Sequence, residues 1–326
     1  MKIIFLGTPE FSVPSLKAIH ESKHDVIAIV SQPDRVASRG NKVILSPVKE
    51  YALANNIPIF QFDKISRDGI ESLKSLEPDL MVTASFGQIL SQEVIDIPKH
   101  GIINVHASIL PHYRGASPIQ TAIMNGDEET GVTIMRTEAG LDTGDIIKVA
   151  KVKISPDETA GELSERLAVL GSEILLEVIN DIEMDEVEYI PQPHIDAKVT
   201  RRIHKEEGKI VWEQSAKEIK AKILAYNPSP IAFSYLGETP VKIYRATIAD
   251  ENMETNEPEG TIIPASSPKK GVFVQCGSGV LELLEVQFPN SKVQKATDAL
   301  NGRKLQVGNR FAYETEITLK TPNILK

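Results

Sequence analysis

Two hydrophobic patterns alternate along the first half of the chain and predict strands that are followed by helices. Short runs of consecutive apolar residues, many of them β-branched, are typical of strands buried on both faces. They lie at 2–6, 25–30, 58–62, 79–84, 102–106, 132–135 and 146–152. Stretches with helical spacing lie at 13–19, after Ser46, and at 70–76, 117–125 and 160–179. This alternation predicts an α/β domain with a doubly wound, mostly parallel sheet.

The second half of the chain has a different pattern, with short strands close together. These predicted strands lie at 232–236, 241–248, 271–276, 280–287 and 310–317, and turn residues separate them. Such spacing is typical of a small OB-like β-barrel, which commonly carries oligonucleotide binding but is not specific to it. A helix is predicted at 216–226, and residues 191–209 are polar without periodicity. We therefore expect a first domain at 1–190, a linker at 191–209 and a barrel domain at 210–326.

Composition narrows the class of protein. A length of 326 residues favours two domains. The single cysteine, Cys276, excludes an intrachain disulfide and a cysteine-based metal cluster, and its apolar neighbours indicate a packing residue. The apolar run before Gly7 is too short for a signal peptide or a membrane span, so we expect a cytoplasmic protein without a membrane partner. The first turn lacks Gly-x-Gly-x-x-Gly, so we expect no nicotinamide cofactor.

Charge is distributed unevenly along the chain. The net charge is −9, which argues mildly against nucleic-acid binding. Residues 201–326, however, hold 18 Lys and Arg against 15 Asp and Glu. A slightly basic C-terminal part permits a polyanionic partner, and an ordinary mixed surface explains the charge equally well.

The candidate chemistry lies at 101–145. Asn104 and His106 interrupt an apolar run two residues apart, so a strand would place both side chains on the same face. Asp142 follows in a glycine-flanked turn. An amide, an imidazole and a carboxylate on strand ends and loops suit acyl transfer. The alternative is that Asn104 and His106 cap neighbouring backbone and that the turn is only a turn.

Ordered motifs in this region resemble the formyltetrahydrofolate-dependent formyltransferases. The motifs are Asn104-Val-His106, Ser108-Ile-Leu-Pro111, Tyr113-Arg-Gly-Ala116, Pro118-Ile-Gln120, Gly131-Val-Thr-Ile134 and Gly140-Leu-Asp-Thr-Gly-Asp145. A lone Asn-x-His is weak support, whereas six motifs in order are specific. The sequence departs from the family at Ala107, where proline is usual, and this change removes no chemical group. The first turn, Gly7-Thr-Pro-Glu-Phe11, resembles in particular the members that act on methionyl-tRNA.

The resemblance implies the donor and the catalytic roles. The donor would be 10-formyltetrahydrofolate, with no metal. Asn104 and His106 would donate hydrogen bonds to the oxyanion, and Asp142 would pair with His106 and move a proton. The donor would lie against a second set of residues: Phe86, Gln88, Ile89, Leu90, Ser108, Ile109, Leu110 and Pro111. Core packing is the alternative for Phe86 and Leu90. Arg114 could hold its loop or bind substrate, and the sequence does not choose.

The resemblance also implies the acceptor. The polar stretch 31–47 is similar to a loop that closes on the tRNA acceptor end in this family, with Arg39 as its key arginine. Arg35 and Lys42 add positive charge, although a solvated surface loop is the alternative. Later segments resemble the family's second domain, namely Lys205-Glu-Glu-Gly-Lys209, Tyr226-Asn-Pro228 and Leu300-Asn-Gly-Arg-Lys-Leu305. Departures at Ser38, Val211 and Ser229 bear on the details of tRNA contact.

The sequence thus predicts formyl transfer to the amino group of methionyl initiator tRNA, for translation initiation, by a monomer. Two alternatives remain. One is a sister formyltransferase or a formyltetrahydrofolate hydrolase with the same core and another acceptor. The other is a tRNA- or ligand-binding protein with a vestigial site, which the presence of all three polar groups disfavours.

Overall fold

The computed structural model describes residues 1–36, 43–253, 255–265 and 271–312, with the backbone alone at 35 and 36. The chain forms two compact units. The first comprises Met1–Pro118, Glu129–Lys153 and Leu163–Arg201. The second comprises Ile119–Glu128, Ile154–Glu162 and the chain from Arg202 onward.

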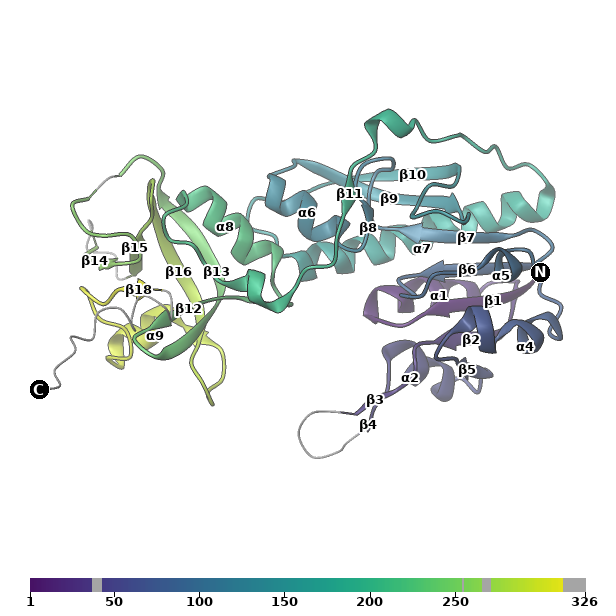
Figure 1. Cartoon of the computed structure of the whole chain (residues 1–326), viewed down its shortest axis with the longest axis horizontal. Helices are drawn as coiled ribbons and strands as arrows, with labels where there is room; N and C mark the ends of the chain where they lie inside the picture. The colour runs from purple at the N-terminus through teal and green to yellow at the C-terminus, as the bar shows by residue number, and fades with distance from the viewer. Residues whose placement is uncertain (37–42, 254, 266–270, 313–326) are drawn as a thin grey trace, which may run out of the picture. The chain divides into compact units, whose positions relative to one another are not determined.

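A mixed sheet forms the centre of the first unit (Figure 1). Its strands are β1 (Lys2–Gly7), β2 (Asp25–Ser31), β5 (Ile59–Gln61), β6 (Leu80–Ala84), β7 (Ile102–His106), β9 (Glu129–Arg136) and β10 (Ile146–Lys153). They are ordered β10-β9-β7-β6-β1-β2-β5. The strands from β7 to β5 pair in parallel, whereas β9 is antiparallel to β7 and to β10. The mostly parallel sheet that the apolar runs predict is confirmed.

Helices connect these strands, most of them where the helical patterns predict. They are α1 (Val13–His20), α2 (Pro47–Ala54), α3 (Ile65–Asp68), α4 (Ile70–Lys74), α5 (Gln92–Ile95), α6 (Pro118–Asn125) and α7 (Ala160–Met184). Ser46 caps α2 as expected, because its Oγ accepts a hydrogen bond of 3.1 Å from the Lys49 N–H. The periodic apolar positions of α7, including Leu167 and Leu175, are fully buried.

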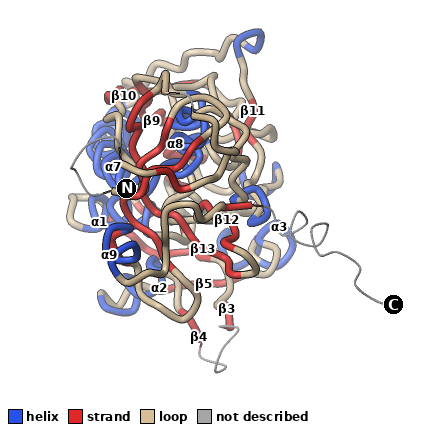
Figure 2. The backbone as a smooth tube through the Cα atoms, turned by 90° about the vertical axis from the view of Figure 1, so that its left-hand side faces the viewer, coloured by secondary structure: helices blue, strands red, loops and turns tan. Residues whose placement is uncertain are grey.

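Two segments without periodicity contain short ladders. The stretch 31–47 contains β3 (Arg35–Val36) and β4 (Val43–Ile44), which pair antiparallel (Figure 2). The stretch 191–209 contains β11 (Val199–Thr200) and short 3₁₀ helices at His194–Asp196 and Lys205–Gly208. β11 pairs in parallel with β8 (Arg114–Gly115). Ladders of two residues are too short to produce a hydrophobic period, so the sequence pattern does not reveal them.

The second unit contains an antiparallel sheet that nearly closes into a barrel. Its strands are β12 (Ala232–Leu236), β13 (Thr239–Asp250), β14 (Ile262–Ile263), β15 (Val272–Gln275), β16 (Val280–Gln287), β17 (Gln294–Lys295) and β18 (Phe311–Ala312). The order is β14-β15-β16-β13-β12-β18, and a bridge between Thr261 and Arg310 joins the two ends. Helices α8 (Ala216–Ala225) and α9 (Ala296–Asn301) also belong to this unit. The predicted barrel is confirmed, and the part of the predicted strand beyond residue 312 lies outside the described residues.

Candidate functional site

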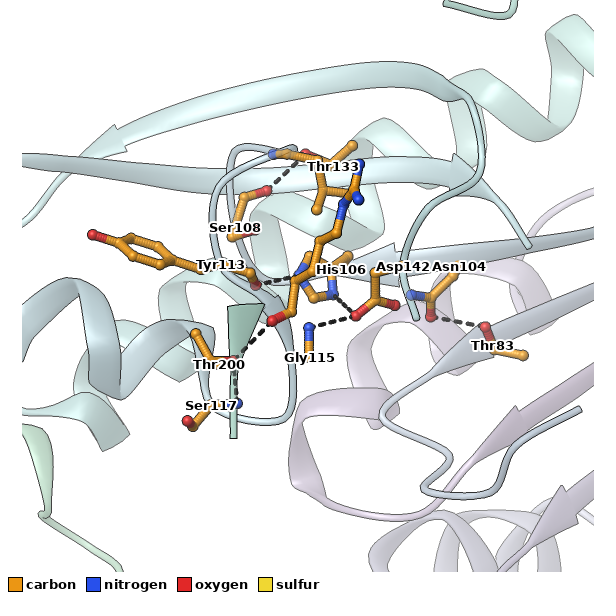
Figure 3. A network of polar contacts seen from close by, with 12 residues as sticks. Thr83, Asn104, His106, Ser108, Tyr113, Gly115, Ser117, Thr133, Asp142 and Thr200 are labelled. Atoms are coloured by element: carbon orange, nitrogen blue, oxygen red, sulfur yellow. Dashed lines mark hydrogen bonds and ion pairs between the residues drawn. The ribbon is translucent and has the colours of Figure 1, made fainter. Parts of the chain in front are cut away.

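The predicted catalytic residues meet where β7 ends. Asn104 and His106 both lie on β7, and Figure 3 shows them together with Asp142 from the later loop. Asn104 is partly buried, and its Oδ1 accepts a hydrogen bond of 2.8 Å from the Thr83 hydroxyl on neighbouring β6. This bond fixes the amide orientation. In the described part of the chain, the Asn104 NH₂ group has no hydrogen-bond partner, so it remains available as a donor.

The His106 ring is held at both of its nitrogen atoms. The side chain is buried, with a relative exposure of 6 % for the residue. Nε2 lies 3.0 Å from the backbone oxygen of Tyr113, a carbonyl that can only accept, so Nε2 carries the hydrogen. Nδ1 then faces Oδ2 of Asp142 at 3.6 Å. This separation exceeds that of a direct hydrogen bond, and it places the carboxylate where it can stabilise a positively charged ring.

Asp142 lies in a tight loop with an unusual backbone conformation. Its φ is +51°, a region that non-glycine residues seldom occupy and that costs of order 1 kcal/mol or more. Its Oδ2 accepts a hydrogen bond of 2.7 Å from the Gly115 N–H. Gly144 allows the loop to turn tightly, since a Cβ there would overlap the backbone oxygen of Arg136. Hydrogen bonds and glycine geometry together hold the carboxylate near His106.

Left-handed backbone recurs around this site. Tyr113 has a φ of +60° and Ser85 a φ of +46°. Gly115, with a φ of +103°, lies so close to β11 that a Cβ would overlap the Thr200 oxygen. Strained conformations of this kind cluster at functional sites, where the surrounding structure holds them. The arrangement offers an amide donor, an imidazole and a carboxylate, which together can stabilise an oxyanion and transfer a proton.

The predicted donor-contacting residues after β6 differ in their exposure. Phe86 and Leu90 are buried in a core cluster with Val94 and Ile95, while Ile89 is 92 % exposed. The Gln88 side chain is already engaged, because its Oε1 accepts from the Ile65 N–H and its Nε2 donates to the Phe62 oxygen. Gln88 therefore anchors this segment, which leaves Ile89 as its most accessible side chain.

The predicted donor-contacting residues after β7 form a closely bonded turn. The Ser108 hydroxyl is buried and donates to the His112 oxygen at 2.6 Å. The Leu110 N–H donates to the Thr133 hydroxyl, which itself donates to the Ser108 oxygen (Figure 3). Leu110 and Pro111 are buried, and Ile109 is partly exposed. The turn offers shape rather than free polar side chains.

A cavity of about 890 Å³ lies beside the Asp142 loop. Residues 136–140, together with Thr143, form one side, and residues 95–96 and 98–101 form another. Arg136, which lies over the Tyr189 ring at 5.5 Å, also lines it. None of the predicted donor-contacting residues lines this cavity. Its volume is in the range of pockets that bind small organic ligands.

The predicted tRNA-contacting residues lie largely beyond what the structure describes. Arg39 and Lys42 lie outside the described residues, and only the backbone of Arg35 is described, on β3. The base of this segment is anchored. Lys49 forms an ion pair with Asp34 at 2.6 Å, and its hydrogen bond holds the pKa of that carboxyl below its usual range. The Gln61 amide also donates to Asp34.

Sequence reasoning missed two residues that hold the site. Thr83, which orients Asn104, belongs to a buried apolar strand, and only its hydroxyl distinguishes it from the valine beside it. Gln192 lies between two prolines in the stretch interpreted as a linker, yet it bonds the Asp142 loop. No sequence signal connects Gln192 with a loop fifty residues earlier.

The described residues contain neither a metal-binding group nor a membrane-spanning helix. No group of His, Cys, Asp and Glu there is arranged to hold a metal ion. Among the described helices, none is long and apolar enough to cross a membrane.

Comparison with known proteins gives a family match for each of the two units. The family model described as formyl transferase matches residues 1–179, and the model of the formyl transferase C-terminal domain matches residues 202–304. The methionyl-tRNA formyltransferase of Acetivibrio thermocellus is 42% identical over 309 residues, covering 94% of this chain and 98% of its own. The methionyl-tRNA formyltransferase of Sulfurihydrogenibium sp. is 44% identical over 313 residues, covering 95% and 100%.

A solved structure shares the fold at lower identity. It is an N-formyltransferase from Helicobacter canadensis in complex with folinic acid and dTDP-3-aminofucose. The TM-score is 0.64 at 22% sequence identity, and the match covers 87% of this chain and 98% of the other.

Proposed function

The chain belongs to the formyl transferase family, and on that premise we propose that it transfers a formyl group to the amino group of methionyl initiator tRNA. The observation that carries the proposal is the convergence of Asn104, His106 and Asp142 at the end of β7. The names of the relatives, at 42–44% identity over nearly the whole chain, support the acceptor.

The three side chains have distinct chemical roles in this proposal. Attack of an amine on a formyl carbon places negative charge on the formyl oxygen. The Asn104 NH₂ group, oriented by Thr83, donates to that oxygen. His106 supplies a second donor through Nδ1 when the ring is protonated, and Asp142 stabilises that charged ring from 3.6 Å. Asp142 also accepts the proton that the attacking amine loses, through a bridging water where direct reach is lacking. It returns this proton to the donor nitrogen, which leaves when the bond between that nitrogen and the formyl carbon breaks.

The family uses formyl-tetrahydrofolate, and we propose 10-formyltetrahydrofolate as the donor. The residues present fit a folate. Exposed Ile89 and the turn at 108–111 follow the carboxyl ends of β6 and β7, where His106 also lies, and offer surfaces for the donor. The Asn104 amide and the His106 ring polarise the carbonyl themselves, so the proposal requires no metal.

The acceptor is the part of the proposal with a specific competitor. The solved N-formyltransferase from Helicobacter canadensis contains dTDP-3-aminofucose, so an amino-sugar nucleotide is the second candidate acceptor. The β-barrel of the second unit favours tRNA, since barrels of this kind often bind oligonucleotides. Arg35, Arg39 and Lys42 are proposed to contact the tRNA.

We further propose a cytoplasmic location, because translation initiation takes place in the cytoplasm. We also propose that the chain is a monomer, and light scattering of the purified chain tests its oligomeric state.

The test is a transfer assay with 10-formyltetrahydrofolate and methionyl initiator tRNA. The wild type is expected to formylate the tRNA, and His106→Ala to lose about 10²–10³-fold in rate. His112→Ala is the matched control, because His112 is an exposed histidine in the turn that follows β7. Full activity in His106→Ala would remove this residue from the mechanism. Transfer to an amino-sugar nucleotide, or release of formate without tRNA formylation, would replace the proposed acceptor.

A further inference from the structure

Both the oxygen and the nitrogen of the Gln192 side-chain amide form two hydrogen bonds each. It is 5 % exposed. Its Oε1 accepts hydrogen bonds from Nε and Nη2 of Arg114, at 3.0 and 2.7 Å. Its Nε2 donates to the backbone oxygens of Asp142, at 3.0 Å, and of Gly144, at 2.6 Å. One side chain thus spans the distance between a buried guanidinium and the backbone on both sides of Thr143.

Arg114 is a buried cation whose partners are neutral. It is 5 % exposed, and its remaining nitrogen, Nη1, lies 3.4 Å from Nδ1 of His194. In the described part of the chain, no carboxylate forms an ion pair with it. Its charge therefore acts on the Gln192 oxygen, and a polarised amide is a stronger donor at its nitrogen. The two bonds to the Asp142 loop are strengthened in this way.

The segment that carries Gln192 is fixed at both ends. On one side, Ile190 and Ile146 exchange backbone hydrogen bonds of 2.9 and 2.8 Å. On the other, β11 pairs with β8, and the Thr200 hydroxyl donates to the Arg114 oxygen at 3.0 Å. Because both ends are held, the Gln192 amide is presented to the loop in one place.

The hydrogen bonds from Gln192 complement the one that the Asp142 carboxylate accepts from Gly115. The Gly115 N–H holds Oδ2 of Asp142, whereas Gln192 holds its backbone, where φ is +51°. A residue in that conformation persists only where its surroundings determine it. The neighbouring Gly115 and Arg114 belong to the same short strand, so the two supports of Asp142 are joined.

We propose that Gln192 is a positioning residue for Asp142, and that buried Arg114 acts through it by orienting and polarising its amide. The inference rests on the proposed function, in which Asp142 supports His106 and accepts a proton. Small displacements of a catalytic group are costly, since about 1 Å can reduce the rate by ~10²-fold. The stretch 191–201 thereby takes part in the site rather than only connecting domains.

The alternative is that Gln192 merely satisfies the buried Arg114. Gln192→Glu distinguishes the two roles. A glutamate keeps the shape and pairs with Arg114 more strongly, but it cannot donate to the oxygens of Asp142 and Gly144. If Gln192 serves only Arg114, this variant keeps its activity. If Gln192 positions Asp142, kcat falls while the fold is retained.

The experiment measures kcat, KM for each substrate and Tm for wild type, Gln192→Glu and Gln192→Met. We expect Gln192→Glu to lose roughly 10- to 100-fold in kcat with little change in KM, and to be at least as stable as Gln192→Met. The matched control is Gln275→Glu, because Gln275 is also buried and donates to a backbone oxygen, but lies in the second unit. Unchanged kcat in Gln192→Glu would overturn the proposal.

A second measurement shows whether Gln192 acts through Asp142. In an Asp142→Asn background, Gln192→Glu is expected to cost less than about 3-fold further, because residues that act as a unit are not additive. Full additivity would overturn the proposal. Amide hydrogen exchange at 140–145, which needs no activity, should accelerate in Gln192→Glu and not in Gln275→Glu; unchanged exchange would also overturn it. Absence of transfer in the wild type would instead refute the proposed function.

Discussion

Different forces hold the Asp142 loop of the first unit and the Trp212 corner of the second. The Trp212 corner is the pair of packed rings of Trp212 and Phe311. Asp142 has a left-handed backbone, and hydrogen bonds from Gly115 and Gln192 hold it in place. Trp212 is 2 % exposed and stacks on Phe311, with ring centroids 5.5 Å apart. Its only polar group, Nε1–H, donates to the Ser234 hydroxyl at 2.9 Å.

This difference indicates which substitutions should change the stability of the protein and which should change its rate. Apolar packing contributes to the free energy of unfolding directly, so a truncation in the Trp212 corner should lower that free energy strongly. Hydrogen bonds contribute little net stability, about 0.5–1.5 kcal/mol each, but they fix geometry. Changes in the Asp142 region should therefore reduce the rate before they reduce the stability. The following predictions test this separation.

Truncation in the apolar corner should have the largest effect. Phe311→Ala is expected to lower the free energy of unfolding by about 3–5 kcal/mol, because a fully buried ring leaves a cavity against Trp212. Urea unfolding followed by tryptophan fluorescence measures it. Phe311→Leu is the control and should cost clearly less, since it retains most of the volume. A loss below about 1 kcal/mol for the alanine would show that stacking is not what holds the corner.

Removal of the free amide donor should produce a loss of rate with little loss of stability. Asn104→Ala is expected to reduce kcat by about 10²–10³-fold, because a donor aimed at the oxyanion is lost. The transfer assay measures the rate, and thermal unfolding measures the stability. Asn55→Ala, a change of an exposed asparagine at the end of α2, should leave the rate unchanged. A fall in Tm that parallels the fall in rate would contradict the separation.

Loss of the orienting hydroxyl should have a smaller effect of the same kind. Thr83→Val keeps the shape of the side chain but removes the 2.8 Å bond to Asn104 Oδ1, which frees the amide to rotate. We expect roughly a 10-fold lower kcat and a stability change of about 1 kcal/mol. Thr83→Ser should restore most of the rate by supplying the hydroxyl again. Equal rates for the valine and serine variants would exclude an orienting role.

The last prediction concerns the stability of the second unit at high pH, where the buried thiol of Cys276 is the group that titrates. Burial raises the pKa of the Cys276 thiol from 9.0 to about 12. Its contribution to stability is therefore fully present below pH 9 and is lost as the pH rises towards 12, because the unfolded chain releases the proton first. The free energy of unfolding should fall by about 1.4 kcal/mol more between pH 8 and pH 10 in the wild type than in Cys276→Ala. Denaturant unfolding at both values measures the difference, and equal pH dependence would contradict a buried neutral thiol.

Much of the fold follows from the local pattern. The apolar runs at 2–6, 25–30 and 79–84 form strands β1, β2 and β6, and the helix after Ser46 begins where expected. The elements missed were short. β3, β4, β8, β11, β14 and β17 contain two residues each, α3 and α5 contain four each, and α9 contains six. Elements of this length are set by their partners across the fold rather than by their own periodicity.

The candidate site was predictable in part. Same-face spacing brought Asn104 and His106 together, and the structure places both on β7. The resemblance, rather than any spacing, connected them with Asp142. Gln88 was predicted to line the donor site, and its side chain bonds Ile65 and Phe62. Its donor-contacting role stays a prediction, as do the roles of Arg35, Arg39 and Lys42 and the domain boundaries at 190 and 210.

By itself, the sequence determined the longer strands and helices of both units and the chemical groups that the site offers, since both depend on residue type and local spacing. Only the tertiary structure decided which groups meet. Thr83 on β6 bonds Asn104 on the neighbouring strand β7, and Gln192 joins Arg114 to the Asp142 loop. These contacts join residues 21 to 78 positions apart along the chain. A hydrogen bond depends on atoms being about 3 Å apart, and chain order does not determine that distance for residues so remote.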